Sequence, residues 1–309
     1  MKEKLKIVFV GIPDMALVCL DNLLKKNFNI VCVVPPNKTH ETYSYYKEFI
    51  DNKNLKLVDF ENSPNEQKTI DEIKALDADI GVVCSYNKLL SKNFLSTTRL
   101  GFINCHPSML PYYRGAAPYF HVINNGEQTS GITLHYMDEK FDTGDIVLSQ
   151  SFELSPLETM GTLFNRTTYM LSDALVEVLS KIEQGIEIKR IPQDKNTTFV
   201  DAPRVSGNFK IRWNKNALEL ERLIRACNPF YNAFCSFRGV SLKIIKASFI
   251  ESNKTYTPGS IIKATKDFLV VSAKTNLLSL EVFQVGTWGI FTPYDFYYTF
   301  TPSIGEILI

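Results

Sequence analysis

Three side chains of complementary chemistry stand out in the sequence: Asn104, His106 and Asp142. They offer an amide, a titratable imidazole and a carboxylate, and the last two are 36 positions apart. An amide can donate a hydrogen bond to an oxyanion, while an imidazole oriented by a carboxylate can move a proton. These residues therefore predict acyl transfer to an amine.

The position of His106 favours a catalytic over a structural histidine. It directly follows an apolar run over residues 101–104, which is typical of a buried strand. Residues 104 and 106 project from the same side of an extended backbone, so that the amide and imidazole can converge on one small group. Cys105 then points away and is expected to pack, while His121 and His135 lack such neighbours and are predicted to be structural.

Four acidic residues compete for the role of the carboxylate that orients His106. Asp138, Glu139 and Asp142 lie in the loop between two predicted strands, 130–137 and 145–152, and Asp145 begins the second of these strands. Any of these carboxylates could orient an imidazole. Spacing does not choose between them.

The elements that must position these residues alternate between strand and helix in the first half of the chain. This rhythm predicts a Rossmann-like, mostly parallel, doubly wound α/β sheet that binds ligands beyond the carboxyl ends of its strands. The first glycine, Gly11, is not followed by another until Gly81, so no dinucleotide fingerprint exists. The predicted strands are 6–10, 28–34, 56–59, 79–84 and 101–104, and the predicted helices are 15–26, 43–52, 66–76 and 160–183.

The remainder of the chain predicts a second, smaller domain. A polar, turn-rich stretch over 192–206 is typical of a linker. A helix over 216–227 and several short strands follow, which favours a small antiparallel β-barrel of the OB-like kind. The expected organisation is therefore a catalytic domain over 1–191, a linker over 192–206 and a barrel domain over 207–309. The short strands are expected over 241–249, 260–264, 268–273 and 277–283.

Composition excludes few functions but sets bounds. The 309 residues carry a formal charge of +1, so whole-chain charge gives no argument for nucleic-acid binding. Residues 207–309 hold 12 Lys and Arg against 7 Asp and Glu, a modest excess that a solvated surface explains equally well. The six cysteines form no CxxC pair, and predict buried reduced thiols and no metal. With no signal peptide and no long apolar run, we expect a cytoplasmic protein without membrane contact.

The segments 104–118 and 141–145 resemble the catalytic segment of the folate-dependent N-formyltransferases, a family that includes methionyl-tRNA, glycinamide ribonucleotide and nucleotide-sugar enzymes. The resemblance implies that Asn104, His106 and Asp142 are catalytic and that 10-formyltetrahydrofolate is the co-substrate. Replacing any of the three with alanine is then expected nearly to abolish turnover. The resemblance further implies that the folate is held by Lys88, Leu89, Leu90, Ser108, Met109, Leu110, Pro111, Asp138, Glu139, Lys140 and Phe141.

The amine acceptor divides the family, and the sequence points both ways. The run 114–118, the two-domain length and the basic second domain favour a transfer RNA. Pro107 after His106, a single lysine in the segment 35–40 and Trp288 in place of a late basic turn favour a nucleotide-linked amino sugar. Glycinamide ribonucleotide is a poorer fit, because that enzyme type has one domain.

We therefore expect a nucleotide-linked amino sugar as acceptor, with methionyl-tRNA as the alternative. A non-catalytic folate- or nucleotide-binding homologue is a third reading, which the intact Asn104, His106 and Asp142 oppose. No DNA partner is expected. The exposed aromatic residues near Trp288 leave a homodimer open.

Overall fold

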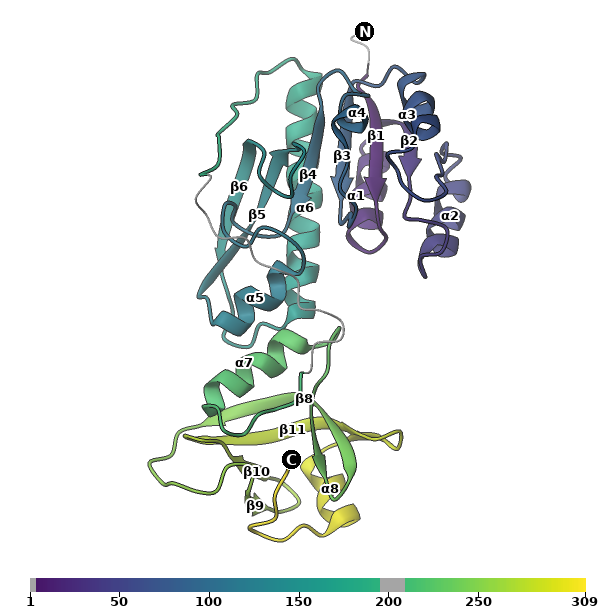
Figure 1. The fold of residues 1–309 in the computed structure, drawn as a ribbon. Helices are drawn as coiled ribbons and strands as arrows, with labels where there is room; N and C mark the ends of the chain where they lie inside the picture. Colours follow the sequence, from purple (N-terminus) through teal and green to yellow (C-terminus); the bar gives the residue numbers. More distant parts are fainter. Residues whose placement is uncertain (1–3, 195–208) are drawn as a thin grey trace. The chain divides into compact units, whose positions relative to one another are not determined.

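The computed structural model describes residues 4–194 and 209–309 of the chain (Figure 1). They form two compact units. Within these ranges, the first comprises residues 4–118, 129–153 and 164–194, and the second comprises residues 119–128, 154–163 and 209–309. Most of the predicted linker over 192–206 lies outside the described residues. Within the described ranges, no helix is both long and apolar enough to cross a bilayer.

The first unit is built on one six-stranded sheet with the order β2-β1-β3-β4-β5-β6. The pairs β1–β2, β1–β3 and β3–β4 are parallel, whereas β5 pairs antiparallel with both β4 and β6. The prediction of a mostly parallel, Rossmann-like sheet is confirmed (Figure 1). The strands are β1 (Lys6–Gly11), β2 (Asn29–Val34), β3 (Ile80–Cys84), β4 (Phe102–His106), β5 (Thr129–Tyr136) and β6 (Ile146–Glu153).

The central strands are apolar because helices cover both faces of the sheet. All five residues of β3 are buried, as expected for a strand between two layers of helices. Gly11 ends β1, and a Cβ there would lie 2.5 Å from that of Ala16, so the absence of a side chain lets α1 approach the strand. The helices in the N-terminal part of the chain are α1 (Met15–Lys25), α2 (Tyr43–Asn52), α3 (Gln67–Lys74), α4 (Lys92–Leu95), α5 (Pro118–Asn125) and α6 (Met160–Glu183). Of these, α5 beyond Pro118 and α6 up to Leu163 belong to the second unit.

The second unit contains a six-stranded antiparallel sheet with β7-β8-β11-β10-β9 in order and β12 paired to β11. The C-terminal tail bonds both edges of this sheet: the backbones of Ile309 and Ser236 exchange hydrogen bonds at β7, and Gly305 N donates to Ile261 O at β9. The tail thereby closes the sheet, as in the predicted barrel. The elements are α7 (Ala217–Cys227), β7 (Ala233–Phe237), β8 (Val240–Ile250), β9 (Ile261–Ala264), β10 (Leu269–Ser272), β11 (Leu277–Val285), β12 (Gly289–Phe291) and α8 (Pro293–Phe300).

Local departures from the sequence prediction have local causes. The strand predicted over 56–59 is only an isolated bridge between Leu57 and Val33. Helix α8 was missed because its aromatic-rich sequence has low helix propensity. A capping box between Thr292 and Asp295 starts it, and Phe296 packs on Phe237 with ring centroids 5.2 Å apart. The sequence also gave no signal for α4, α5, β7 and β12.

Candidate active site

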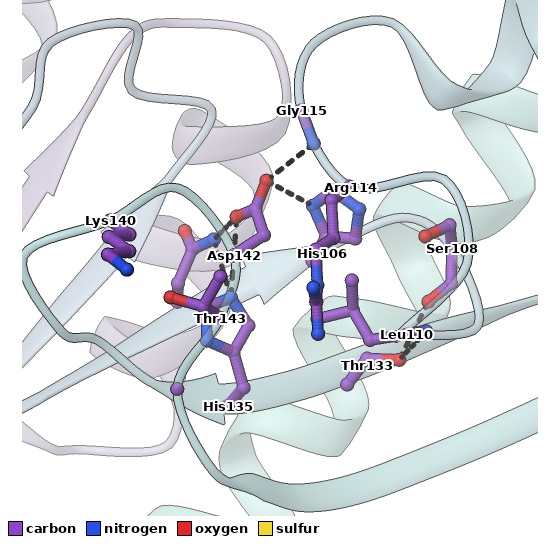
Figure 2. A network of polar contacts seen from close by, with 12 residues as sticks. His106, Ser108, Leu110, Arg114, Gly115, Thr133, His135, Lys140, Asp142 and Thr143 are labelled. Atoms are coloured by element: carbon purple, nitrogen blue, oxygen red, sulfur yellow. Dashed lines mark hydrogen bonds and ion pairs between the residues drawn. The ribbon is translucent and has the colours of Figure 1, made fainter. Parts of the chain in front are cut away.

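The sheet brings the three predicted catalytic side chains together at its carboxyl edge. Figure 2 shows two of them, His106 and Asp142, facing each other. Strand β4 carries Asn104 and His106, and the loop between β5 and β6 carries Asp142. In the antiparallel register of β4 with β5, Asn104 lies opposite His135. The site is therefore assembled where a parallel strand meets an antiparallel one.

The carboxylate of Asp142 lies at the centre of this cluster. Its Oδ2 accepts a hydrogen bond from Gly115 N at 2.8 Å and lies 3.6 Å from His106 Nδ1. Its Oδ1 accepts from Asn104 Nδ2 at 3.1 Å and lies 3.4 Å from His135 Nε2. The backbone of Asp142 has a φ of 54°, a strained conformation that these side-chain contacts hold in place.

The turn that follows Asp142 requires a glycine. A Cβ at Gly144 would lie 1.8 Å from the carbonyl oxygen of Tyr136, so any side chain would push the loop away from β5. Asp138 has a different role, because it accepts hydrogen bonds from Lys140 N at 2.9 Å and from the Thr143 hydroxyl. The structure thus selects Asp142 as the carboxylate that faces the imidazole.

The tautomer of His106 follows from its hydrogen bond to the backbone. Its Nε2 lies 2.9 Å from Tyr113 O, and a carbonyl oxygen can only accept, so Nε2 carries a proton. Nδ1, which faces Asp142, is then the atom that takes up and releases a second proton. Asp142 is placed to stabilise the imidazolium form.

His135 belongs to the same cluster, although the sequence predicted only a structural role for it and gave no reason to place it beside Asn104. Its Nδ1 donates to Tyr136 O at 2.8 Å, which leaves Nε2 as an acceptor for Asn104 Nδ2 at 3.1 Å. The Asn104 amide therefore donates one hydrogen to His135 and the other to Asp142. Only the pairing of the two strands could have placed His135 in this cluster, because residue 135 lies opposite residue 104 when β5 runs antiparallel to β4.

Burial and neighbouring charges act in opposite directions on the pKa values of His106 and Asp142. Burial lowers the pKa of His106, and His135 lowers it further, against the raising effect of Asp142. Burial would raise the pKa of Asp142, but His106, His135 and Gly115 N–H outweigh it and hold that pKa below its ordinary value. At neutral pH the cluster therefore contains an ionised Asp142 beside a neutral His106, which is a competent base.

Gln193 ties the Asp142 loop to the loop that contains Gly115. Its side-chain amide donates to Asp142 O at 3.1 Å and to Gly144 O at 2.7 Å. Its Oε1 accepts from Arg114 Nε at 3.1 Å and Nη2 at 2.8 Å. Arg114 is only 5% exposed, so its guanidinium is a buried strut between segments. No sequence motif indicated Gln193, because it lies 51 positions from Asp142.

Replacing Gln193 with leucine should lower the free energy of unfolding by about 1–3 kcal/mol, because it leaves the buried Arg114 guanidinium and two carbonyl groups with fewer partners. Urea denaturation followed by circular dichroism measures this change. Gln150→Leu is the matched control, since Gln150 is exposed on β6 and its loss should cost within about 0.5 kcal/mol. Equal free energies of unfolding for the two variants would contradict the stabilising role of Gln193.

The residues implied to hold the folate divide into three groups by position. In the segment after β3, Leu90 is buried, whereas Lys88 and Leu89 are exposed. In the segment after β4, the Ser108 hydroxyl donates to Tyr112 O at 2.8 Å and Leu110 N donates to the Thr133 hydroxyl, before a cis peptide bond to Pro111. The remaining positions, Met109, Asp138, Glu139, Lys140 and Phe141, are half-buried or exposed. Their contact with a folate stays a prediction.

A hollow of about 650 Å³ opens beside the Asp142 loop. Its lining includes the basic side chains of Arg114, Lys140 and Arg190, with Tyr136 between them. The Arg190 guanidinium lies over the Tyr136 ring, 3.6 Å from its centroid. The hollow is wide enough to take part of a drug-sized ligand.

Comparison with known sequences gives one consistent family. The formyl transferase model matches residues 5–179, and the model of the formyl transferase C-terminal domain matches residues 206–299. The chain is 34% identical over 288 residues to a methionyl-tRNA formyltransferase of Clostridioides difficile, covering 91% of this chain and 92% of that one. It is 33% identical over 292 residues to that of Flavobacterium johnsoniae, with coverages of 91% and 92%.

Solved structures of the same fold include sugar-modifying enzymes. The N-formyltransferase from Helicobacter canadensis, in complex with folinic acid and dTDP-3-aminofucose, superposes with a TM-score of 0.68 at 20% identity, covering 89% of this chain and 99% of that one. WlaRD, a sugar 3N-formyl transferase, gives 0.64 at 21% identity, covering 90% and 98%. With both domain models matched in order and relatives similar over nine-tenths of its length, the chain belongs to the formyl transferase family.

Proposed function

We propose that this formyltransferase moves the formyl group of 10-formyltetrahydrofolate to the amine of a nucleotide-linked amino sugar. The observation that carries the chemistry is the cluster of Asn104, His106 and Asp142, in which an ionised carboxylate faces a neutral imidazole. Family membership supplies the reaction class. The choice of acceptor depends on the surface features described below.

In the proposed reaction the amine nitrogen attacks the formyl carbon and forms a C–N bond. The carbonyl π electrons move to oxygen, and Asn104 Nδ2 donates a hydrogen bond to the resulting oxyanion. His106 Nδ1 takes the proton that the amine loses, and Asp142 stabilises the imidazolium. When the oxyanion collapses, the bond to N10 of the folate breaks and the proton passes to that nitrogen.

The hydrogen bonds of Asn104 add a requirement to this scheme. Both of its amide hydrogens are engaged, one by His135 Nε2 and one by Asp142 Oδ1, each at 3.1 Å. The formyl oxygen must therefore displace one of these acceptors. The Asn104 donor is already oriented by both, so little rotamer entropy is lost when the oxyanion takes over.

The rate of formyl transfer should fall in acid with a midpoint below the ordinary histidine value of about 6.5. Burial lowers the pKa of His106, so the neutral base persists to lower pH and is lost only as pH falls through that lowered value. A profile of kcat/KM against pH measures the midpoint. His135→Gln should move it upward, because His135 lowers the pKa of His106. A midpoint well above 6.5 in the wild type would contradict the assignment.

Two features of the first unit weaken the case for a polyanionic acceptor. Lys38 is the one lysine in the segment 35–40, and its Nζ forms an ion pair with Asp59 at 3.2 Å. Arg114, in the run that favoured transfer RNA, is buried against Gln193. Affinity for RNA depends on accumulated free cations that meet phosphates, and neither side chain is free.

Methionyl-tRNA is the second candidate, and the sequence comparisons favour it. The relatives from Clostridioides difficile and Flavobacterium johnsoniae, at 34% and 33% identity, both carry the name methionyl-tRNA formyltransferase. The sugar-modifying structures are only 20–21% identical and support the fold alone. The names of the relatives therefore favour a transfer-RNA acceptor, whereas the charge pattern of this chain argues against one.

Formyl transfer from 10-formyltetrahydrofolate should be measured on initiator methionyl-tRNA and, in parallel, on a panel of nucleotide-linked 3- and 4-amino-deoxysugars. Turnover of a sugar without turnover of the tRNA is the expected result. Turnover of the tRNA alone would overturn the proposed acceptor and leave the chemistry intact. Loss of the active reaction in His106→Ala is the control that places the chemistry in this cluster.

A further inference from the structure

Three cysteines meet in the core of the first unit, on the face of the sheet opposite the active site. Cys84 ends β3, Cys105 lies beside it in register on β4, and Cys19 comes from α1. Their sulfur atoms all lie within 4.8 Å of one another, and all three residues are buried. The sequence had predicted only separate packing thiols here.

We propose that Cys19, Cys84 and Cys105 form a three-sulfur binding site for a soft, thiophilic ion, and that trivalent arsenic is the ion that fits it. Soft sulfur ligands select soft ions over magnesium, calcium or manganese. Structural zinc takes four ligands, and in the described residues this group offers three cysteines with no histidine or carboxylate to complete a tetrahedron. A three-coordinate ion suits the set.

The net charge of the complex between the ion and the three thiolates narrows the choice of ion further. All three thiols are buried in the core of the first unit, Cys19 and Cys84 with 0% of their surface exposed and Cys105 with 3%. A buried complex with net charge and no counter-ion is costly. Three thiolates leave a net charge of −2 around copper(I) and −1 around zinc(II), but they neutralise arsenic(III).

The binding step balances without an oxidant. Arsenous acid, As(OH)₃, exchanges each of its three hydroxyl groups for one thiol sulfur. Three As–O bonds break, three As–S bonds form, and each thiol proton leaves with a hydroxide as water. No redox change occurs, and the product stays neutral.

One neighbouring feature supports the cluster as a site rather than chance packing. The Tyr46 hydroxyl is buried and, within the described residues, has no hydrogen-bond partner. Cys84 and Cys19 both act on this hydroxyl, which can donate a hydrogen bond to a sulfur ligand.

Occupation of this site should slow formyl transfer, because Cys105 lies between Asn104 and His106 on β4. Three sulfurs drawn onto one ion pull β4 and β3 toward α1, and the shift moves the Asn104 and His106 side chains on the other face. A displacement of 1 Å in a catalytic group can cost about 10²-fold in rate. This consequence rests on the proposed function, whereas ion binding does not.

The test incubates the reduced full-length protein with arsenite for hours, since the sulfurs are buried, and removes free arsenite by gel filtration. Elemental analysis should find one arsenic per chain in the wild type and in Cys32→Ala, the matched control. Cys32 is a buried cysteine of the same sheet outside the cluster. Cys19→Ala and Cys105→Ala should each retain almost none. Equal retention by all four proteins would overturn the site.

X-ray absorption at the arsenic edge of the loaded wild type keeps the proposal testable if a variant fails to fold. Three sulfur neighbours and no oxygen are expected, and an arsenic–oxygen shell would overturn it. Stoichiometric retention of zinc(II) without retention of arsenite would overturn the choice of ion. Bound arsenic with an unchanged rate of formyl transfer would overturn the coupling through β4.

Discussion

Asp142→Asn should lower kcat for formyl transfer by about 10³–10⁴-fold, the loss that follows when the carboxylate that orients a catalytic histidine is neutralised. Asparagine keeps the shape of the side chain and can still accept the hydrogen bond from Gly115 N. It cannot stabilise an imidazolium at His106 Nδ1, which lies 3.6 Å from Asp142 Oδ2. Because Asp142 also raises the pKa of His106, the variant's imidazole becomes a weaker base.

Asp79→Asn is the matched control for this substitution. Asp79 is also partly buried, with its pKa held low by Lys6 N and Arg99 against the effect of burial, but it lies at the amino edge of β3. Its loss should leave kcat within about two-fold, since no catalytic group depends on it. Comparable losses of kcat in both variants would show that Asp142 acts through stability alone.

The same substitution has a pH signature in stability. The pKa of Asp142 is lower in the folded chain than its ordinary value of about 3.9, so ionised Asp142 stabilises the fold above that value. The contribution is lost as pH falls through the lowered folded pKa. Urea denaturation of the wild type and Asp142→Asn should therefore show a difference at pH 7 that narrows below about pH 4.

The fold of the first unit could be read from local pattern. The buried strands are continuous apolar runs, such as 80–84, because helices cover both faces of a parallel sheet. The fold of the second unit was harder to predict from the sequence. Strand β7 and helix α8 depend on contacts made far along the chain, such as Phe237 with Phe296, and on the tail that bonds Ser236. Local propensity carries little of that information.

The same difference between local pattern and long-range contact holds for the residues of the site. Asn104 and His106 could be found because they are two positions apart on one strand, so their common direction is a property of the backbone. His135 and Gln193 could not, because their places follow from strand register and from a loop that returns 51 residues after Asp142. The three-thiol cluster is of the second kind, since α1, β3 and β4 meet only in the folded sheet.

Asn104→Ala should lower kcat by about 10²–10³-fold with a much smaller change in KM, the loss typical of one missing oxyanion donor. The reason is that Asn104 meets the formyl oxygen chiefly when that oxygen becomes charged, so its bond is stronger in the transition state than in the bound substrate. Rapid-quench assays with radiolabelled formyl donor measure the chemical step directly.

Asn22→Ala is the control for Asn104→Ala, because the Asn22 amide also donates within the first unit, to the Ser172 hydroxyl at 2.9 Å, yet it lies on α1. Both variants lose a buried or half-buried amide, but only Asn104→Ala should lose rate. The Asn104→Ala substitution also leaves His135 Nε2 without the hydrogen bond that the Asn104 amide donates. A loss of kcat/KM that comes from a rise in KM alone, with kcat unchanged, would mean that Asn104 binds the substrate and does not stabilise the oxyanion.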